Sequence, residues 1–254
     1  MTQEAFPAPA IVQNWKPFLI CGCSHGLHAD QSALDVVVKT RNELNPSVVV
    51  HLGDFIDTTA FRSGAQGTAD EGADVDADTT AGLNFLTRLR PTHVFDGNHE
   101  HRIRKHLDHQ NALIQKCARD TAKHLAEYIR DELKAFYVDS YDITRSWLML
   151  GPYALGHGWM FGEQAVRDHA EMIGNCIIAH THSFDVSRGR VAGGATGISV
   201  GMLADAQKLT YALGRRATHK WTQSFLTGED SDKQLIYRPH IIRESQSAAF
   251  ERIA

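Results

Sequence analysis

Short apolar runs that each end in a polar turn recur five times along the chain. These runs, with their turns, cover residues 17–25, 48–54, 93–99, 153–157 and 176–182. Segments of this length, rich in Val and Ile and bounded by Gly, are typical of buried strands. We therefore predict five strands, each followed by side chains that can bind a metal or carry a proton.

Segments with helical spacing separate these runs. Asp30 is suited to capping a helix that extends to about Leu44. Further helices are predicted over residues 80–89, 100–116, 118–133 and 163–173. Strands that alternate with helices predict an α/β fold, in which ligand-binding groups gather beyond the carboxyl ends of the strands. All five polar turns fall at such ends.

The rest of the chain has a weaker pattern. Residues 191–203 and 234–242 indicate further strands, which we expect to form a second sheet packed on the first. No repeat or linker divides the sequence, so residues 1–254 are expected to form a single domain. Residues 58–80 are acidic and Gly-rich and predict a mobile surface loop near the site. In this loop Asp74, Asp76 and Asp78 have calcium-loop spacing, but the expected Gly and terminal Glu are missing.

Composition adds few constraints. Hydrophobic residues make up 43% of the chain and charged residues 22%, as in ordinary globular proteins. No apolar run approaches the ~20 residues that cross a bilayer, and the first residues lack the basic and apolar regions of a secretory signal. We therefore expect a cytoplasmic protein with no membrane partner. The net charge of −4 argues against non-specific coating of nucleic acid.

Each polar turn, taken singly, has a plain structural explanation. A Gly-Asp pair after a strand is commonly turn chemistry, and a single His at a strand end is commonly structural. The chain has 15 histidines, the residue that most often binds transition metals. Five such turns, all at strand ends, are poorly explained as independent accidents.

The ordered motifs resemble those of the calcineurin-like metallophosphoesterases. That family carries D-x-H, G-D-x-x-D, G-N-H-(D/E), a lone His and G-H-x-H. The corresponding segments here are Cys23-Ser24-His25, Gly53-Asp54-Phe55-Ile56-Asp57, Gly97-Asn98-His99-Glu100, Gly156-His157 and Ala179-His180-Thr181-His182. The resemblance covers residues 23–182 and implies a four-layer αββα sandwich with the site at the sheet edge. It extends, more loosely, to phage and bacterial members of about this length.

The resemblance also implies two divalent metal ions and a role for each motif residue. His25 and His182 would bind the first ion, Asn98, His157 and His180 the second, and Asp54 would bridge both. His99 would donate a proton to the leaving group or contact the phosphate, and Asp57 would orient a ligand histidine. Two ions ~3.5–4 Å apart can clamp phosphate oxygens and activate a water. A carboxylate between them screens their repulsion.

Cys23 departs from the family pattern, which has Asp at this position. Its thiolate could bind the first ion, and soft sulfur favours Zn or ferrous Fe there over Mg, with Mn a further option for the pair. Alternatively it is a small buried thiol. We favour ligation, since the Gly22-Cys23-Ser24-His25-Gly26 turn is similar to that of RNA lariat debranching enzymes. Cys21 is expected to be core on the same strand face, and no disulfide framework is expected.

Basic residues flank the motifs. Arg102 could hold a substrate phosphate with paired donors, whereas Arg104 and Lys105 are equally explained as a solvated helix face. His28 could line the site or be exposed. A second basic group, followed by aromatic residues, could grip a nucleotide or could be a surface turn before a core strand. It consists of Arg215, Arg216, His219 and Lys220, with Trp221 and Phe225.

Three functions remain open on these grounds. The first is a phosphodiesterase acting on a nucleotide or nucleic acid. The second is a phosphomonoesterase acting on a small metabolite or phosphoprotein, which uses the same metal clamp. The third is a degenerate member that binds phosphates or a protein without turnover, as the Cys23 replacement suggests. The sequence does not indicate an oligomeric state.

Overall fold

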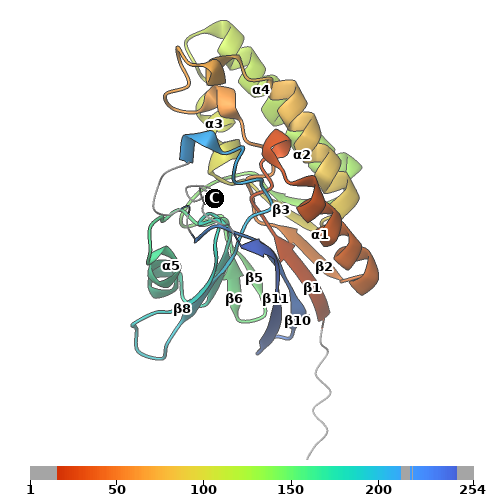
Figure 1. Ribbon diagram of the computed structural model, residues 1–254, viewed down its shortest axis with the longest axis vertical. Helices are drawn as coiled ribbons and strands as arrows, with labels where there is room; N and C mark the ends of the chain where they lie inside the picture. Colours follow the sequence, from red (N-terminus) through yellow and green to blue (C-terminus); the bar gives the residue numbers. More distant parts are fainter. Residues whose placement is uncertain (1–15, 213–217, 219, 245–254) are drawn as a thin grey trace, which may run out of the picture.

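Two sheets pack face to face in the computed structural model, which describes residues 16–212, 218 and 220–244 (Figure 1). The first sheet has the order β11-β10-β1-β2-β3-β4. Its strands are β1 (Lys16–Cys21), β2 (Val48–His51), β3 (His93–Phe95), β4 (Phe136–Val138), β10 (Thr222–Asp230) and β11 (Leu235–Glu244). The second sheet has the order β5-β6-β7-β9-β8. Its strands are β5 (Leu148–Leu150), β6 (Tyr153–Leu155), β7 (Cys176–Ile178), β8 (Phe184–Arg188) and β9 (Thr196–Val200).

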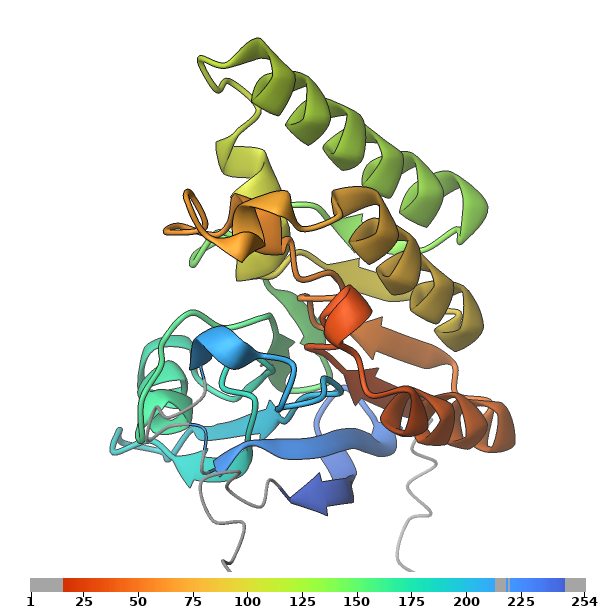
Figure 2. The same cartoon turned by 45° about the horizontal axis from the view of Figure 1, so that its top comes forward.

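Helices cover the outer face of each sheet. The α-helices are α1 (Gln31–Leu44), α2 (Val75–Leu89), α3 (Asn98–Lys105), α4 (Ala112–Glu127) and α5 (Ala165–Ile173). A π-helical turn, η4 (Tyr128–Glu132), continues α4, and short 3-10 turns are η1 (Gly26–His28), η2 (Thr59–Phe61), η3 (Ala69–Gly72) and η5 (Thr210–Ala212). In Figure 2, α4 (green) runs along the top of the molecule, on the far side of α2 from the second sheet.

Alternation along β1 explains the layers. Phe18 and Ile20 belong to the core between the two sheets, whereas Leu19 and Cys21 pack against α1 and α2. A further core joins the helices α2 to α4 to β3 and β4, and a small one joins α5 to the second sheet. Burial of apolar surface on both faces stabilises each sheet by ~25 cal/mol per Å2. The arrangement is therefore helix, sheet, sheet, helix, which confirms the predicted α/β sandwich.

The five motif-bearing runs form strands whose carboxyl ends lie together. β1 pairs in parallel with β2, and β2 with β3, so their following turns share one edge of the first sheet. β6 pairs in parallel with β7 in the second sheet. Because the two sheets are stacked, the turns of both sheets can meet beyond their edges.

The structure corrects several predicted elements. The strand predicted over residues 234–242 lies in the first sheet as β11, paired with β10, and not in the second. The helix predicted over residues 100–116 is broken, since α3 ends at Lys105 and Asn111 caps α4 by accepting the amides of Leu113 and Ile114. The helix predicted over residues 118–133 is the continuation of α4.

The acidic segment at residues 58–80 is partly helical. It contains η2, η3 and the first turn of α2. Asp74 caps α2 by accepting the amide of Ala77, and Asp78 is buried inside the protein. Two of the three aspartates with calcium-loop spacing thus have structural roles within the chain. None of the helices among the described residues combines the length and apolar character needed to span a bilayer.

Candidate metal centre

Left-handed backbone marks the turns that follow the strands. Cys23, His25, Asp54 and His182 have φ of 51°, 55°, 55° and 60°. Residues other than Gly adopt this conformation at a cost of ~1–3 kcal/mol, and such strain concentrates at functional sites. Glycine is required beside them: a Cβ on Gly97 would lie 2.2 Å from Asp54 Oδ1. The G-D and G-N pairs of the sequence are therefore explained by two turns that approach each other closely.

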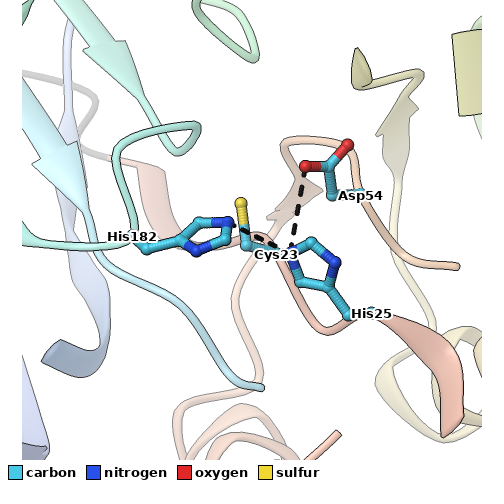
Figure 3. A group of neighbouring side chains, drawn as sticks. All are labelled: Cys23, His25, Asp54 and His182. Carbon is cyan, nitrogen blue, oxygen red and sulfur yellow. Dashed lines mark hydrogen bonds and ion pairs between the residues drawn. The ribbon is translucent and has the colours of Figure 1, made fainter. Parts of the chain in front are cut away.

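A first cluster brings together a thiol, two imidazoles and a carboxylate. One ligand-type atom from each of Cys23, His25, Asp54 and His182 lies within 4.8 Å of the others (Figure 3). All four residues are at least 92% buried, and His25 Nε2 lies 3.1 Å from His182 Nε2. The four side chains point toward one another in Figure 3, from the turns after β1, β2 and β7.

A second cluster shares the same carboxylate. Asp54, His157 and His180 also offer atoms within 4.8 Å of one another. His157 Nε2 lies 3.2 Å from Asp54 Oδ2, 3.2 Å from His180 Nδ1 and 3.1 Å from the Oδ1 of Asn98. The seven residues predicted to bind metal are thus all brought to one place, although they are separated by up to 159 positions in the chain (182 − 23).

Hydrogen bonds outside the clusters fix how the imidazoles face them. His25 Nδ1 lies 2.9 Å from Asp57 Oδ1, and His157 Nδ1 lies 2.6 Å from the carbonyl oxygen of Leu52. Because both partners are acceptors, each Nδ1 carries the proton and donates it. Each Nε2 is then left with a lone pair aimed into the site, the tautomer that binds metals.

Several acceptor atoms of the centre lack a hydrogen-bond donor and are better satisfied by cations. Asp54 Oδ2 is buried without a hydrogen-bond partner, and the lone pair of His157 Nε2 lies 3.2 Å from it and 3.1 Å from Asn98 Oδ1. Three acceptors that converge without a proton repel one another, and a buried unsatisfied acceptor costs ~1–3 kcal/mol. Divalent ions would remove this penalty, so the residues present fit the metals that the resemblance implies.

The pKa shifts favour the ligand forms. Burial, with the neighbouring His157, lowers the pKa of His180 to about 3, and burial with His25 lowers the pKa of His182 well below its usual range. Burial acts to raise the pKa of Asp54, but His157 and His99 outweigh it and hold that pKa well below the ordinary value. Neutral imidazoles and an ionised carboxylate are the forms that bind divalent metals.

Asp57 contacts three histidines in or beside the centre. Its Oδ1 lies 2.9 Å from His25 Nδ1 and 3.1 Å from His99 Nδ1, and its Oδ2 lies 3.5 Å from His28 Nδ1. Burial acts to raise the pKa of Asp57, but its hydrogen bonds to these histidines lower it strongly overall. His28 therefore lies against this carboxylate.

His99 and Arg102 form a pair beside Asp54. His99 Nδ1 lies 2.7 Å from the carbonyl oxygen of Asp57, which also accepts from Arg102 at 2.8 Å. Arg102 donates to His99 Nε2 at 3.0 Å, because a guanidinium has no lone pair to offer. His99 Nε2, 3.8 Å from Asp54 Oδ2, is therefore an acceptor in this state.

Two buried carboxylates that sequence reasoning missed hold the ligand turns. Glu100 accepts the amides of Asp54, Ile56 and Gly97 at 2.7–3.1 Å. Asp78, from α2, accepts the amides of Leu27, Asp57 and Thr58 at 2.8–3.1 Å. The Glu of the G-N-H-E motif was visible in the sequence, whereas Asp78 was hidden among other acidic residues.

Cys23 is completely buried, with its sulfur directed into the first cluster (Figure 3). Burial, with Asp54 nearby, raises the pKa of its thiol well above the ordinary value when no cation is present. Cys21 is core, as expected, but it faces α1, whereas Cys23 belongs to the core between the sheets. The expectation of a shared face is wrong because the left-handed turn at Cys23 ends the strand alternation.

The remaining basic and aromatic candidates have different surroundings. Arg104 forms an ion pair with the buried Asp96, whereas Lys105 is exposed to solvent. Trp221 is buried, with its ring 4.9 Å from that of His182. Phe225 is core, so it does not grip a ligand. Lys220 is exposed, and Arg215, Arg216 and His219 lie outside the described residues.

Comparison with known proteins identifies the family. A family model of calcineurin-like phosphoesterases matches residues 16–184, more than half of the chain. The chain therefore belongs to the calcineurin-like phosphoesterases, which are generally metal-dependent hydrolases of phosphate esters. No curated protein matches the chain.

Three solved structures are similar to this chain. A hypothetical protein of Pyrococcus horikoshii is 9% identical, with coverage of 91% of this chain and 89% of that one and a TM-score of 0.49. The protein TT1561 of Thermus thermophilus is 11% identical, with coverage of 91% and 100% and a TM-score of 0.42. Yfce, a phosphoesterase from E. coli, is 14% identical, with coverage of 89% and 100% and a TM-score of 0.36.

Proposed function

We propose that this chain is a metal-dependent phosphodiesterase with a dinuclear centre, acting on a nucleotide or nucleic-acid diester. The observation that carries the proposal is the position of Asp54, which belongs to both ligand clusters. A buried carboxylate shared by two clusters is suited to bridging two cations, since one anion between them screens their repulsion.

In this proposal seven side chains hold the ions. One ion takes Cys23, His25, Asp54 and His182, and the other takes Asp54, Asn98, His157 and His180. The sulfur of Cys23 favours Zn or ferrous Fe at the first position, and the nitrogen and oxygen ligands of the second accept Mn as well. When bound, the ions supply Lewis-acid polarisation of the phosphoryl oxygens and activation of a water.

The other residues position and complete the reaction. Asp57 fixes the tautomer of His25, and Leu52 fixes that of His157. His99 and Arg102 lie together at the rim, where Arg102 can donate to a phosphoryl oxygen. Such a contact would draw the guanidinium from His99 Nε2, and that nitrogen could then take up a proton and donate it to the phosphate or to the leaving oxygen. Among the described residues Arg102 supplies a guanidinium at this rim, and its single positive charge suits the single negative charge of a diester.

A comparison of two chromogenic substrates tests the proposal. The metal-replete protein is expected to hydrolyse bis(4-nitrophenyl) phosphate faster than 4-nitrophenyl phosphate, and to lose both activities with a chelator. His99→Ala should lower the diester rate by ~10²–10³-fold without changing metal content. A preference for the monoester would support the phosphomonoesterase alternative on a metabolite or phosphoprotein.

The alternative of a binding protein without turnover makes a different prediction. A metal-replete preparation that hydrolyses neither ester, but binds phosphate, would overturn the enzyme proposal. The pairing of His99 with Arg102 beside Asp54 argues for turnover, because a phosphate-binding protein has no need of a residue to serve a leaving group. The cytoplasmic location depends on the first residues of the chain, outside the described part, and stays a prediction.

A further inference from the structure

The proposed metal ligand His157 lies near the start of the loop that connects β6 to α5. Its carbonyl oxygen accepts the amides of Ala179 and His180 at 3.1 and 3.0 Å, which ties it to the turn after β7. Gly158 then has a φ of 91°, and a Cβ at this position would lie 3.2 Å from the Cβ of Ile178. The backbone of His157 is thus fixed on the side of β7, whereas its other side depends on what holds the loop.

His169, from α5, holds this loop through its imidazole. The residue is completely buried, and its Nε2 accepts the amides of Trp159 at 2.9 Å and Met160 at 3.4 Å. Its Nδ1 lies 2.7 Å from the carbonyl oxygen of Ala165, which can only accept, so Nδ1 carries the proton and donates it. The indole of Trp159 packs edge-on against the imidazole, with 4.5 Å between the ring centres. Both ring nitrogens of His169 are therefore used within the protein, in one tautomer.

Tyr141 contacts the loop at the preceding residue. Its hydroxyl donates to the carbonyl oxygen of Gly158 at 3.0 Å, and its ring lies 5.8 Å from the ring of His157. The carbonyl of Gly158 and the amide of Trp159 belong to one peptide group, which is thus bound at its oxygen by Tyr141 and at its nitrogen by His169. Because a peptide group is planar, it cannot rotate here without breaking one of these hydrogen bonds.

The held peptide bears on metal binding because His157 is oriented by backbone alone. Asp57 orients His25 through a carboxylate, whereas Nδ1 of His157 donates to the carbonyl oxygen of Leu52. The position of the His157 backbone therefore decides whether Nε2 stays 3.2 Å from Asp54 Oδ2. Partners outside the ligand shell typically change metal affinity by ~10–100-fold.

We propose that His169 is a positioning residue for the second cluster. It acts through the peptide between Gly158 and Trp159, with Tyr141 as its partner, and keeps His157 where it can bind an ion. The inference rests on the proposed function in one respect, which is that His157 is a metal ligand. His169 contacts neither ion nor substrate in this role. The support of the centre thereby extends to α5, which lies between the motifs of the sequence.

Two amide substitutions separate the two ring nitrogens of His169. His169→Gln places an acceptor oxygen near the position of Nε2, whereas His169→Asn keeps a donor for Ala165 but is too short to reach the amide of Trp159. Mn suits the nitrogen and oxygen ligands of the second cluster better than the sulfur of the first, so it is the probe. In calorimetric titration of the metal-free protein, the Kd for Mn should rise about tenfold in His169→Asn and less than about threefold in His169→Gln.

Two further variants distinguish positioning from stability. Ile173→Ala, on the same helix, removes a side chain packed on the small core of α5 and should lower the unfolding temperature without changing Mn affinity. Tyr141→Phe removes only the hydroxyl that donates to Gly158 and should weaken Mn binding about threefold. If His169→Asn does not fold, Tyr141→Phe decides the question.

Unchanged Mn affinity in His169→Asn and Tyr141→Phe, or an equal loss of affinity in Ile173→Ala, would overturn the positioning role. The titration does not depend on turnover. A protein that binds Mn in this pattern but hydrolyses neither chromogenic ester would overturn the proposed function and leave the role of His169 standing.

Discussion

The two candidate metal clusters share Asp54 but differ in chemistry and in surroundings. Cys23, His25 and His182 of the first cluster are at least 92% buried and all have left-handed backbone. In the second cluster Asn98 and His180 are only half-buried, and neither has a positive φ. A buried site with a sulfur ligand retains a soft ion, whereas a more open nitrogen and oxygen site exchanges its ion more readily. We therefore expect chelators to empty the second cluster first.

Asp54→Asn is the substitution with the largest expected effect, since it removes the charge that both clusters share. Loss of several kcal/mol of electrostatic stabilisation should lower diester hydrolysis by ~10³-fold or more. Elemental analysis should show fewer than two ions per chain. Asp76→Asn, at an exposed position of α2, is the control. Retention of both ions and of near-normal activity in Asp54→Asn would contradict a shared bridging carboxylate.

Cys23→Ser separates the two clusters, because only the first contains sulfur. Zn affinity of the first cluster should fall by at least about tenfold, with little change at the second. Cys23→Asp should restore an oxygen ligand and shift the preference toward Mn. Zn titration monitored by calorimetry measures both effects, with the exposed Cys117→Ser as control. If Zn binds Cys23→Ser as tightly as the wild type, the thiol is only a core residue.

Asp78→Asn tests whether a carboxylate that holds the ligand turns, without binding metal itself, contributes to metal affinity. An amide offers one acceptor oxygen where the carboxylate offers two, so at least one of the three amides that Asp78 receives loses its partner. Metal affinity should fall by about tenfold, the lower end of the effect of outer partners. A loss of thermal stability with normal metal affinity would mean that Asp78 serves the fold and not the centre. Asp76→Asn again provides the matched control.

Because His51 is buried, we expect the stability of the metal-free protein to fall at acidic pH. Its Nε2 lies 3.2 Å from Ser24 Oγ, and burial lowers its pKa to about 3. The unfolded chain, with a histidine pKa near 6.5, binds the extra proton, so stability falls as the pH drops below about 6.5. Between pH 7 and pH 5 this one group should remove about 2 kcal/mol from the free energy of unfolding. In urea unfolding, the free energy of unfolding of His51→Gln should fall less between pH 7 and pH 5 than that of the wild type. An equal fall in both proteins would mean that other groups cause the acid sensitivity.

The motif-bearing part of the fold was predictable because its strands are apolar runs with Gly turns. β1, β2, β3, β6 and β7 all carry this pattern, and the structure brings their seven ligand candidates together, while their roles stay proposals. β4 and β5 have three residues each, as β3, β6 and β7 do, but no motif turn follows them to mark where they end. β10 is buried but polar, since Gln223 donates to Asp30 and Ser224 donates to Val200. Hydrogen bonds between distant residues satisfy these groups, and no local pattern reveals them.

The left-handed backbone of the first cluster has a consequence for how an ion enters. Four residues are held in a disfavoured conformation by the surrounding turns before any cation arrives, with Glu100 and Asp78 anchoring the amides around them. The conformational entropy of these residues is therefore lost when the chain folds. Binding of the ion then requires little further ordering of the chain. An ion that binds only this folded arrangement raises the temperature of unfolding by an amount that grows with the excess of its concentration over Kd. Thermal unfolding can therefore report metal loading in a sample for which no substrate is yet at hand.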